Sequence, residues 1–177
     1  TPLPPCGTGV KVSFVCDVSR PEDLVQAPGT DWIVVANLAD ARRPGSGGLT
    51  LINDKTRVAS RVTWRPGKAR GAYKACAAAP DPMKYSGHGL SIRPAGRGRS
   101  TLFVVSHGGR EAIEVFDIDA RRGVPTVTWA GCIPAPPGSQ LNSVTALADG
   151  RVFATDFVRP PLAIIDALAG RNTGAVY

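Results

Sequence analysis

The sequence predicts an all-β fold, and three observations carry that prediction. Short apolar or alternating runs of four to seven residues recur along the chain, as in strands. Turn-forming clusters separate these runs, and the chain contains 20 Gly and 16 Pro. Helical periodicity is nearly absent. Together these features favour many short antiparallel strands joined by tight turns.

Eight of the runs stand out as expected strands: 31–36, 48–52, 58–64, 102–106, 112–116, 124–129, 151–155 and 162–165. The clearest turns between them lie at 43–48, 120–123 and 148–150, where Gly combines with Pro, Arg or Asp. The spacing of strands and turns is typical of antiparallel sheets rather than of strands that alternate with helices.

A repeat organises these strands into three units. The units begin at Glu22, His88 and Asn142, about 66 and 54 residues apart, and each start is followed by a turn and an apolar strand. Four short antiparallel strands per unit is the pattern of a propeller blade. We therefore predict that residues 1–177 form roughly the first half of one β-propeller, about three four-stranded blades, with no separate second domain.

Blade number sets a further expectation about partners. Propellers usually close with four to eight blades, and this chain supplies fewer than three complete ones. The segment 172–177 falls where a fourth strand of the third unit is expected. We therefore expect a missing C-terminal half or a second polypeptide to complete the ring. Either is favoured over a second copy of this chain, because the sequence stops inside a strand.

The net charge of +7 raises the question of nucleic-acid binding. The arginines are scattered through Gly- and Pro-rich turns, with neither a basic helix nor aromatic side chains interleaved with basic ones. This distribution indicates solvated loop tips, and no nucleic-acid partner is expected.

The cysteines and the N-terminus indicate an oxidising compartment. Cys6, Cys16, Cys76 and Cys132 show no CxxC spacing and do not form a zinc set with the two histidines, so disulfides are the expected use. Two of the last three could link adjacent outer strands. The start at Thr1 fits a processed secreted or periplasmic chain. No apolar run approaches the roughly 20 residues that cross a bilayer.

The three unit starts supply the candidate site. First residues of innermost blade strands face the central channel, so Glu22, His88 and Asn142 are expected to converge. A carboxylate with an amide oxygen suits Ca²⁺ better than zinc. Asp23 points to the opposite side of its strand and could serve a different ion or a structural hydrogen bond. An exposed turn pair, a core histidine and a turn asparagine are the simpler alternatives.

The stretch from His88 to His107 resembles the paired-histidine segment of the paraoxonase/arylesterase family, in which an HGIS-type motif precedes a strand ending in VNH. The residues 113–117 resemble that family's next strand, Leu141-Asn142 its LND-type calcium motif, and Glu22-Asp23-Leu24 its EDL motif. Wider similarity to gluconolactonase-type and strictosidine-synthase-like propellers lies at 148–150 and 172–174. The resemblance implies a six-bladed propeller when the ring is complete.

The same resemblance implies metal ligands. Glu22 and Asn142 would bind a catalytic calcium ion, whereas Asp23 and the backbone carbonyl of Leu90 would bind a structural one. Ser143 stands where the family has an Asp, and a hydroxyl is a weaker ligand for a hard cation than a carboxylate, which puts the structural ion in question.

It also implies roles for the two histidines and for the first cysteine. His88 would be the general base, or would position the base, with His107 as its partner. Cys6 would be a half-cystine whose partner lies near the far C-terminus of the family and is absent from this sequence.

The expected activity is calcium-dependent hydrolysis of lactones or esters by a histidine-activated water. No Gly-x-Ser-x-Gly elbow is present, so a serine nucleophile is not indicated. Two alternatives remain open at this stage. One is a sugar lactonase that uses a different base, and the other is a non-enzymatic propeller that binds a ligand or a protein, with calcium only structural.

Overall fold

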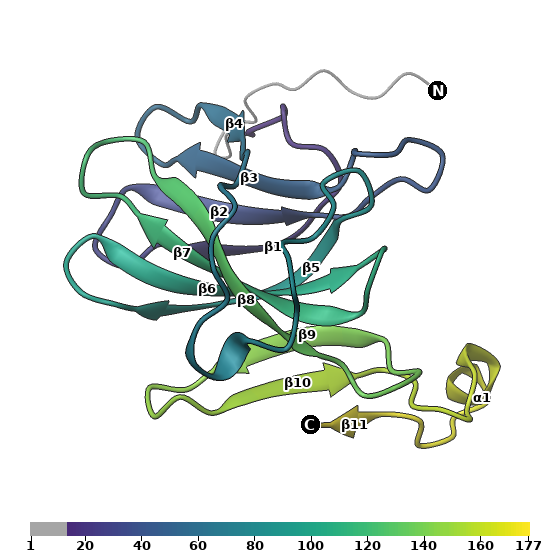
Figure 1. Ribbon diagram of the computed structural model, residues 1–177. Coiled ribbons are helices and arrows are strands. Elements are labelled where there is room, and N and C mark those ends of the chain that lie inside the picture. Colours follow the sequence, from purple (N-terminus) through teal and green to yellow (C-terminus); the bar gives the residue numbers. More distant parts are fainter. Residues whose placement is uncertain (1–13) are drawn as a thin grey trace, which may run out of the picture.

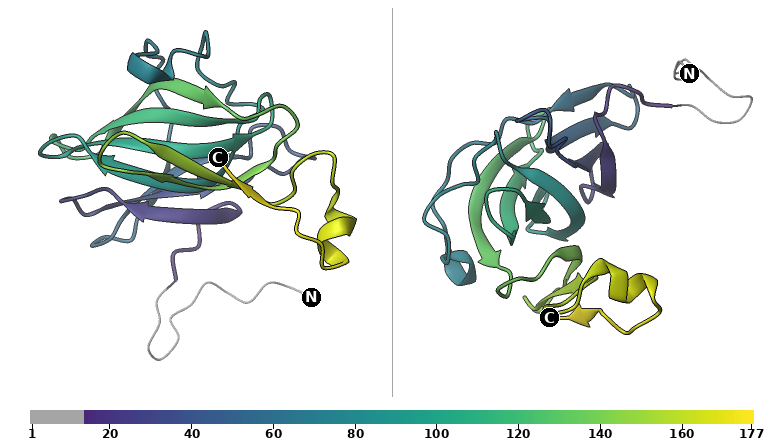
Figure 2. Two further views of the ribbon diagram at one scale, coloured as in Figure 1. Left: turned by 90° about the horizontal axis from the view of Figure 1, so that it is seen from below. Right: turned by 90° about the vertical axis from the view of Figure 1, so that its right-hand side faces the viewer.

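A computed structural model of the chain describes residues 14–177 and contains three antiparallel sheets (Figure 1). Their strand orders are β1-β2-β3-β4, β5-β6-β7-β8 and β11-β10-β9. The predicted all-β class is confirmed. In the right-hand view of Figure 2 the sheets follow one another along an arc, and the described part of the chain does not close into a ring.

The first sheet comprises β1 (Pro21–Gln26), β2 (Trp32–Asn37), β3 (Gly48–Asn53) and β4 (Ala59–Arg61), each paired with the next. β4 is shorter than the run predicted at 58–64. The reason is that the chain leaves this sheet and pairs with the second one. The amide of Arg65 donates to the carbonyl of Val127, and the carbonyl of Arg65 accepts from the amide of Trp129.

The second sheet lies between the other two and is apolar on both faces. It comprises β5 (Ser86–Pro94), β6 (Arg99–His107), β7 (Ala112–Asp119) and β8 (Thr126–Pro134). Side chains alternate along β6, so that Leu102 and Val104 pack toward the first sheet while Phe103 and Val105 pack toward the third. Each fully buried side chain of this size contributes about 1.5–3 kcal/mol, so the middle sheet binds both neighbours firmly.

The third sheet has only three strands, β9 (Leu141–Ala146), β10 (Val152–Asp156) and β11 (Ala175–Val176). The predicted strand at 162–165 is wrong, because this segment runs from a turn into the helix α1 (Ile164–Leu168). The assignment of 172–177 to a fourth strand is also wrong, since β11 is the third. Four strands per unit therefore holds for the first two units and not for the last.

Local hydrogen bonding explains why a helix forms here. The Asp166 carboxylate accepts the amide hydrogen of Ala163 at 2.8 Å, as in one half of a capping box. Asp166 also pairs with Arg171 at 2.5 Å. Gly170, with φ of 78°, follows the last turn as a left-handed stop that favours glycine. These local contacts outweigh the β preference of the two isoleucines.

The long connection between the first two sheets packs along the edge of β8. It contains a short 3₁₀ helix, Gly71–Tyr73, followed by Cys76, which forms a disulfide with Cys132; the two Cα atoms lie 5.7 Å apart. The pair joins this connection to β8 instead of joining two outer strands, as had been one expectation. Cys6 lies outside the described residues. Within residues 14–177, no helix is long and apolar enough to cross a bilayer.

Tyr85 carries a prediction about stability. Its ring packs against Trp64 and Phe116, with ring centroids 5.0 and 6.4 Å away, and its buried hydroxyl has no hydrogen-bond partner among the described residues. An unsatisfied buried hydroxyl costs about 1–3 kcal/mol. We expect Tyr85→Phe to raise the free energy of unfolding by about 1 kcal/mol, measured by chemical denaturation near neutral pH. A clear loss of stability would contradict this account.

The same substitution has a pH signature. Burial raises the pKa of Tyr85 well above its ordinary value of 10.0, with the nearby charge of Glu114 as a second cause. The unfolded chain therefore releases the phenolic proton at a lower pH than the folded protein does. The stability that depends on keeping Tyr85 protonated is therefore fully present below about pH 10, and it is lost as the pH rises further. The gap between Tyr85→Phe and the wild type should widen in that range.

Candidate functional site

The first strands of the three sheets meet, and they bring three of the predicted residues together. β5 contacts both β1 and β9. His88 on β5 lies between the other two residues: its Nε2 is 3.5 Å from Glu22 Oε1 on β1, and its Nδ1 is 2.7 Å from the carbonyl oxygen of Asn142 on β9. The structure therefore brings these three residues together, with Asn142 contacting His88 through its backbone carbonyl.

Gly89 permits this close approach of β5 and β9. A Cβ atom at Gly89 would lie 2.5 Å from the carbonyl oxygen of Asn142 and 2.7 Å from the Cα of Ser143. Both contacts are with backbone, so a side chain could not be accommodated without moving β9. The glycine after His88 is thus needed to bring the histidine against Asn142.

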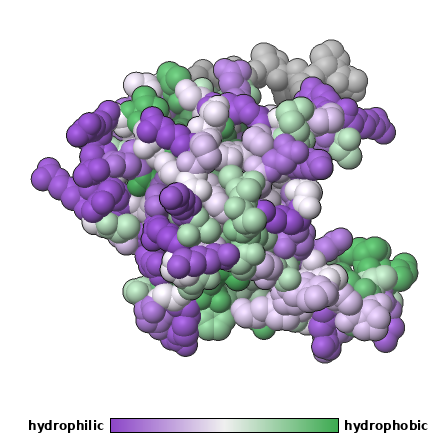
Figure 3. Space-filling model, in the orientation of Figure 1, coloured by the Kyte–Doolittle hydropathy of each residue, from purple (hydrophilic) through white to green (hydrophobic). Residues whose placement is uncertain are grey.

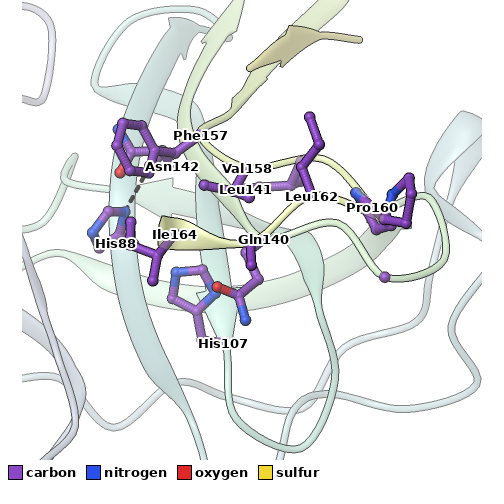
Figure 4. Close-up of a pocket in the computed structure, with 13 residues that line it drawn as sticks. His88, His107, Gln140, Leu141, Asn142, Phe157, Val158, Pro160, Leu162 and Ile164 are labelled. Carbon is purple, nitrogen blue, oxygen red and sulfur yellow. Dashed lines mark hydrogen bonds between the residues drawn. The ribbon is translucent and has the colours of Figure 1, made fainter. Parts of the chain in front are cut away.

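His107 lies beside His88 and is the fourth residue of the candidate site. It is the last residue of β6, and its ring centroid lies 5.1 Å from that of His88, with the planes inclined by 60°. The two rings line one open pocket of about 630 Å³, and Figure 4 shows them beside Gln140 and Asn142. The structure therefore places the predicted histidine pair at a single cavity.

Hydrogen bonding fixes where the proton of a neutral His88 must lie. The backbone carbonyl oxygen of Asn142 can only accept a hydrogen bond, so Nδ1 of His88 donates to it. The lone pair of a neutral ring is then on Nε2, which faces the Glu22 carboxylate at 3.5 Å. Two acceptors cannot bond to each other. A proton, a water molecule or a cation between them would satisfy both, so this is a position suited to one of the three.

Asp23 makes the structural hydrogen bond that was one of its two expected roles. Its Oδ2 accepts the amide hydrogen of Leu90 at 2.7 Å, and its Oδ1 accepts that of Leu24 at 2.8 Å. The carboxylate thus ties β1 to β5 two residues beyond His88. Ligation of a structural calcium by Asp23 and the Leu90 carbonyl stays a prediction. Ser143 donates its amide hydrogen to Thr155 Oγ1 at 3.0 Å.

Glu111 is a site residue that the sequence reasoning missed. Its Oε2 lies 2.8 Å from Nδ1 of His107, and its Oε1 accepts the amide hydrogen of Leu141 at 2.8 Å. The residue follows the turn between β6 and β7, four positions after His107. A His-Gly-Gly-Arg-Glu turn, which folds a carboxylate back onto its histidine, is the sequence signal that could have revealed it.

The oxygen atoms at this position suit a hard cation, although the described residues supply few of them. Glu22 offers a carboxylate and Asn142 an amide oxygen, whereas calcium takes six to eight oxygen ligands. Between residues 14 and 177, no three His, Cys, Asp or Glu side chains gather into a metal-binding group. Other ligands would have to be main-chain carbonyls, water or groups beyond these residues.

The opposite wall of the pocket is apolar. It is formed by the segment that leads from β10 into α1, chiefly Phe157, Val158, Pro160, Leu162 and Ile164. Ile165 and Leu168 continue the apolar surface outward and are exposed, and apolar side chains gather over α1 in Figure 3. The pocket therefore places two imidazoles opposite a surface that an uncharged, apolar group can contact.

Comparison with known proteins adds no family to this description. No protein-family model and no curated protein matches the chain.

Proposed function

We propose that this protein is a calcium-dependent hydrolase of lactones or carboxylic esters, built on a β-propeller and similar to the paraoxonase/arylesterase family. The observation that carries the proposal is the position of His88. It is held by the carbonyl of Asn142, faces the Glu22 carboxylate and lies against His107 at a pocket. An imidazole beside a carboxylate and an amide oxygen that could help to hold a cation is an arrangement that metal-assisted hydrolysis can use.

The residues have distinct roles in this proposal. Glu22 and Asn142 would hold calcium, which when bound would supply polarisation of the substrate carbonyl. Nε2 of His88 accepts a proton from water while the water oxygen forms a bond to the carbonyl carbon and the π pair of the C=O bond moves to its oxygen, from which it re-forms the carbonyl as the leaving group departs. The bond from that carbon to the leaving oxygen then breaks, and the leaving oxygen takes the proton from His88. An ester gives an acid and an alcohol, and a lactone gives a hydroxy acid.

Exposed apolar side chains support further blades at both ends of the arc. Leu24 on β1 is 62% exposed, and Phe153 and Val176 on the third sheet are 37% and 67% exposed. A propeller blade normally buries such side chains against its neighbours. We therefore propose that additional blades, carried by the rest of the protein or by a second polypeptide, cover these faces. The Cys76–Cys132 bond favours a secreted or periplasmic location.

Calcium removal tests the proposed function. Hydrolysis of δ-valerolactone and of phenyl acetate by the purified native protein, together with any polypeptide that copurifies with it, is measured with calcium, after treatment with EGTA, and after calcium is restored. We expect activity to disappear with EGTA and to return with Ca²⁺ but not with Mg²⁺, which demands stricter octahedral geometry. Thermal melting is followed in the same samples. A fall in melting temperature without any hydrolysis in either state would instead indicate a binding protein with structural calcium.

A further inference from the structure

Glu111 is held between two groups on different strands, and its partners differ in kind. One oxygen faces Nδ1 of His107 at 2.8 Å, and the other accepts from the amide of Leu141 at 2.8 Å. We propose that Glu111 is a positioning residue that fixes the tautomer of His107, so that the Nε2 of this ring is a proton acceptor at the pocket. This inference rests on the proposed function for its catalytic consequence only.

The tautomer follows from the chemistry of the partners. An ionised carboxylate can only accept hydrogen bonds, so Nδ1 of a neutral His107 must carry the proton that it donates to Glu111. Nε2 then carries the lone pair. A carboxylate that orients a histidine in this way is a common means of setting which ring nitrogen acts as the base. The Glu111 and His107 side chains are about one quarter exposed, at 25% and 27%, so solvent reaches the pair.

The amide of Leu141 fixes which kind of atom at residue 111 faces His107. A backbone amide can only donate, so whichever atom of residue 111 faces Leu141 must be an acceptor. Glutamine at 111 would satisfy Leu141 with its carbonyl oxygen and would then present its NH₂ group to His107. That NH₂ group donates, so His107 would have to accept at Nδ1 and carry its proton on Nε2. Glu111→Gln therefore reverses the tautomer while it keeps the bond to β9.

When both histidines are neutral, each therefore has a hydrogen-bond acceptor at Nε2. Asn142 fixes the proton of neutral His88 on Nδ1, and Glu111 fixes that of His107 on Nδ1. Both Nε2 atoms are then acceptors, and two acceptors cannot share a direct hydrogen bond. A water molecule that donates one hydrogen to each ring satisfies both. In the proposed reaction, His107 is then a second proton acceptor at the cavity, available to orient water for attack.

The experiment reads the tautomer directly. The chain has only two histidines, so a long-range ¹H–¹⁵N spectrum of the ring nitrogens, recorded above about pH 8 where an ordinary imidazole is neutral, contains two spin systems. His107→Gln assigns them. We expect Nδ1–H for His107 in the native protein and Nε2–H in Glu111→Gln, with His88 unchanged in both. Asp149→Asn, which removes an exposed carboxylate paired with Arg151, is the matched control and should leave both rings as in the native protein.

Kinetics complete the test. We expect Glu111→Gln to lower kcat for δ-valerolactone by about tenfold to a hundredfold, with KM nearly unchanged, since the substrate contacts remain. An Nε2–H tautomer of His107 in the native protein, or no change of tautomer in Glu111→Gln, would overturn the inference even if calcium-dependent hydrolysis is found. If the tautomer reverses in a protein with no hydrolytic activity, the positioning role of Glu111 stands and the proposed function fails.

Discussion

His88→Gln is expected to lower lactone turnover by at least about a hundredfold, the usual contribution of a general base, while changing calcium affinity much less. The difference arises because the two properties depend on different atoms. Calcium binding would rest on the oxygens of Glu22 and Asn142. Proton transfer depends on the Nε2 lone pair of His88, which stays free because Nδ1 donates to the backbone carbonyl of Asn142. Glutamine can donate to that carbonyl but has no basic nitrogen.

The measurement pairs steady-state kinetics with calcium titration by calorimetry on the same preparation. Asp149→Asn again serves as the control, because its carboxylate lies in the turn between β9 and β10 and pairs with Arg151. Equal losses of calcium binding and turnover in His88→Gln would show that the histidine holds the metal position together. In that case the assignment of His88 as the base would have to be abandoned.

Arg110→Ala is expected to destabilise the fold by about 3 kcal/mol, the lower end of the range for removing one partner of a buried ion pair, because Glu114 is buried whereas Arg110 is 31% exposed. Glu114 is fully buried within β7. Its carboxylate accepts from Arg110 Nε at 2.6 Å and from Arg110 Nη2 at 2.9 Å, and it also accepts from Trp129 Nε1 at 2.8 Å. Without Arg110 the carboxylate keeps a single neutral donor, which cannot compensate a buried charge.

Chemical denaturation measures this loss, and an exposed ion pair supplies the control. Arg121 pairs with Asp119 on the surface and lowers the pKa of that carboxyl group through a side-chain hydrogen bond, but both side chains are open to solvent. Exposed pairs of this kind contribute at most about 1 kcal/mol. Similar losses for Arg110→Ala and Arg121→Ala would contradict the account of Glu114 as a buried charge that depends on its partner.

The sequence allowed the strands and the convergence of the site to be predicted because both depend on short-range pattern. Alternation along β6 and the turns around it define a strand that is buried on both faces. The repeat places Glu22, His88 and Asn142 at the same position of successive sheets. Sheets that stack along an arc must bring equivalent residues together, so the positions could be inferred without knowledge of any contact.

The features that were missed depend on contacts that no repeat encodes. Residues 162–165 have the composition of a strand, but the hydrogen bond from Ala163 to Asp166 starts a helix instead. The 58–64 run stops pairing with β3 after Val62, and the next paired residue, Arg65, bonds to β8, a partner more than sixty residues away. Glu111 has no counterpart at the equivalent place of another unit, so its position beside His107 emerged only when the β6–β7 turn was seen in space.

The most direct test of the central claim is the dependence of δ-valerolactone hydrolysis on free calcium concentration, for the native protein and for Glu22→Gln. Replacing the carboxylate with an amide removes a charged oxygen ligand and keeps the shape of the side chain. We predict that hydrolysis by the native protein rises to saturation with calcium and that Glu22→Gln needs at least about tenfold more calcium to reach half of its maximum. Hydrolysis that is independent of calcium, or an identical calcium dependence in the two proteins, would contradict a calcium-dependent hydrolytic centre at Glu22, His88 and Asn142.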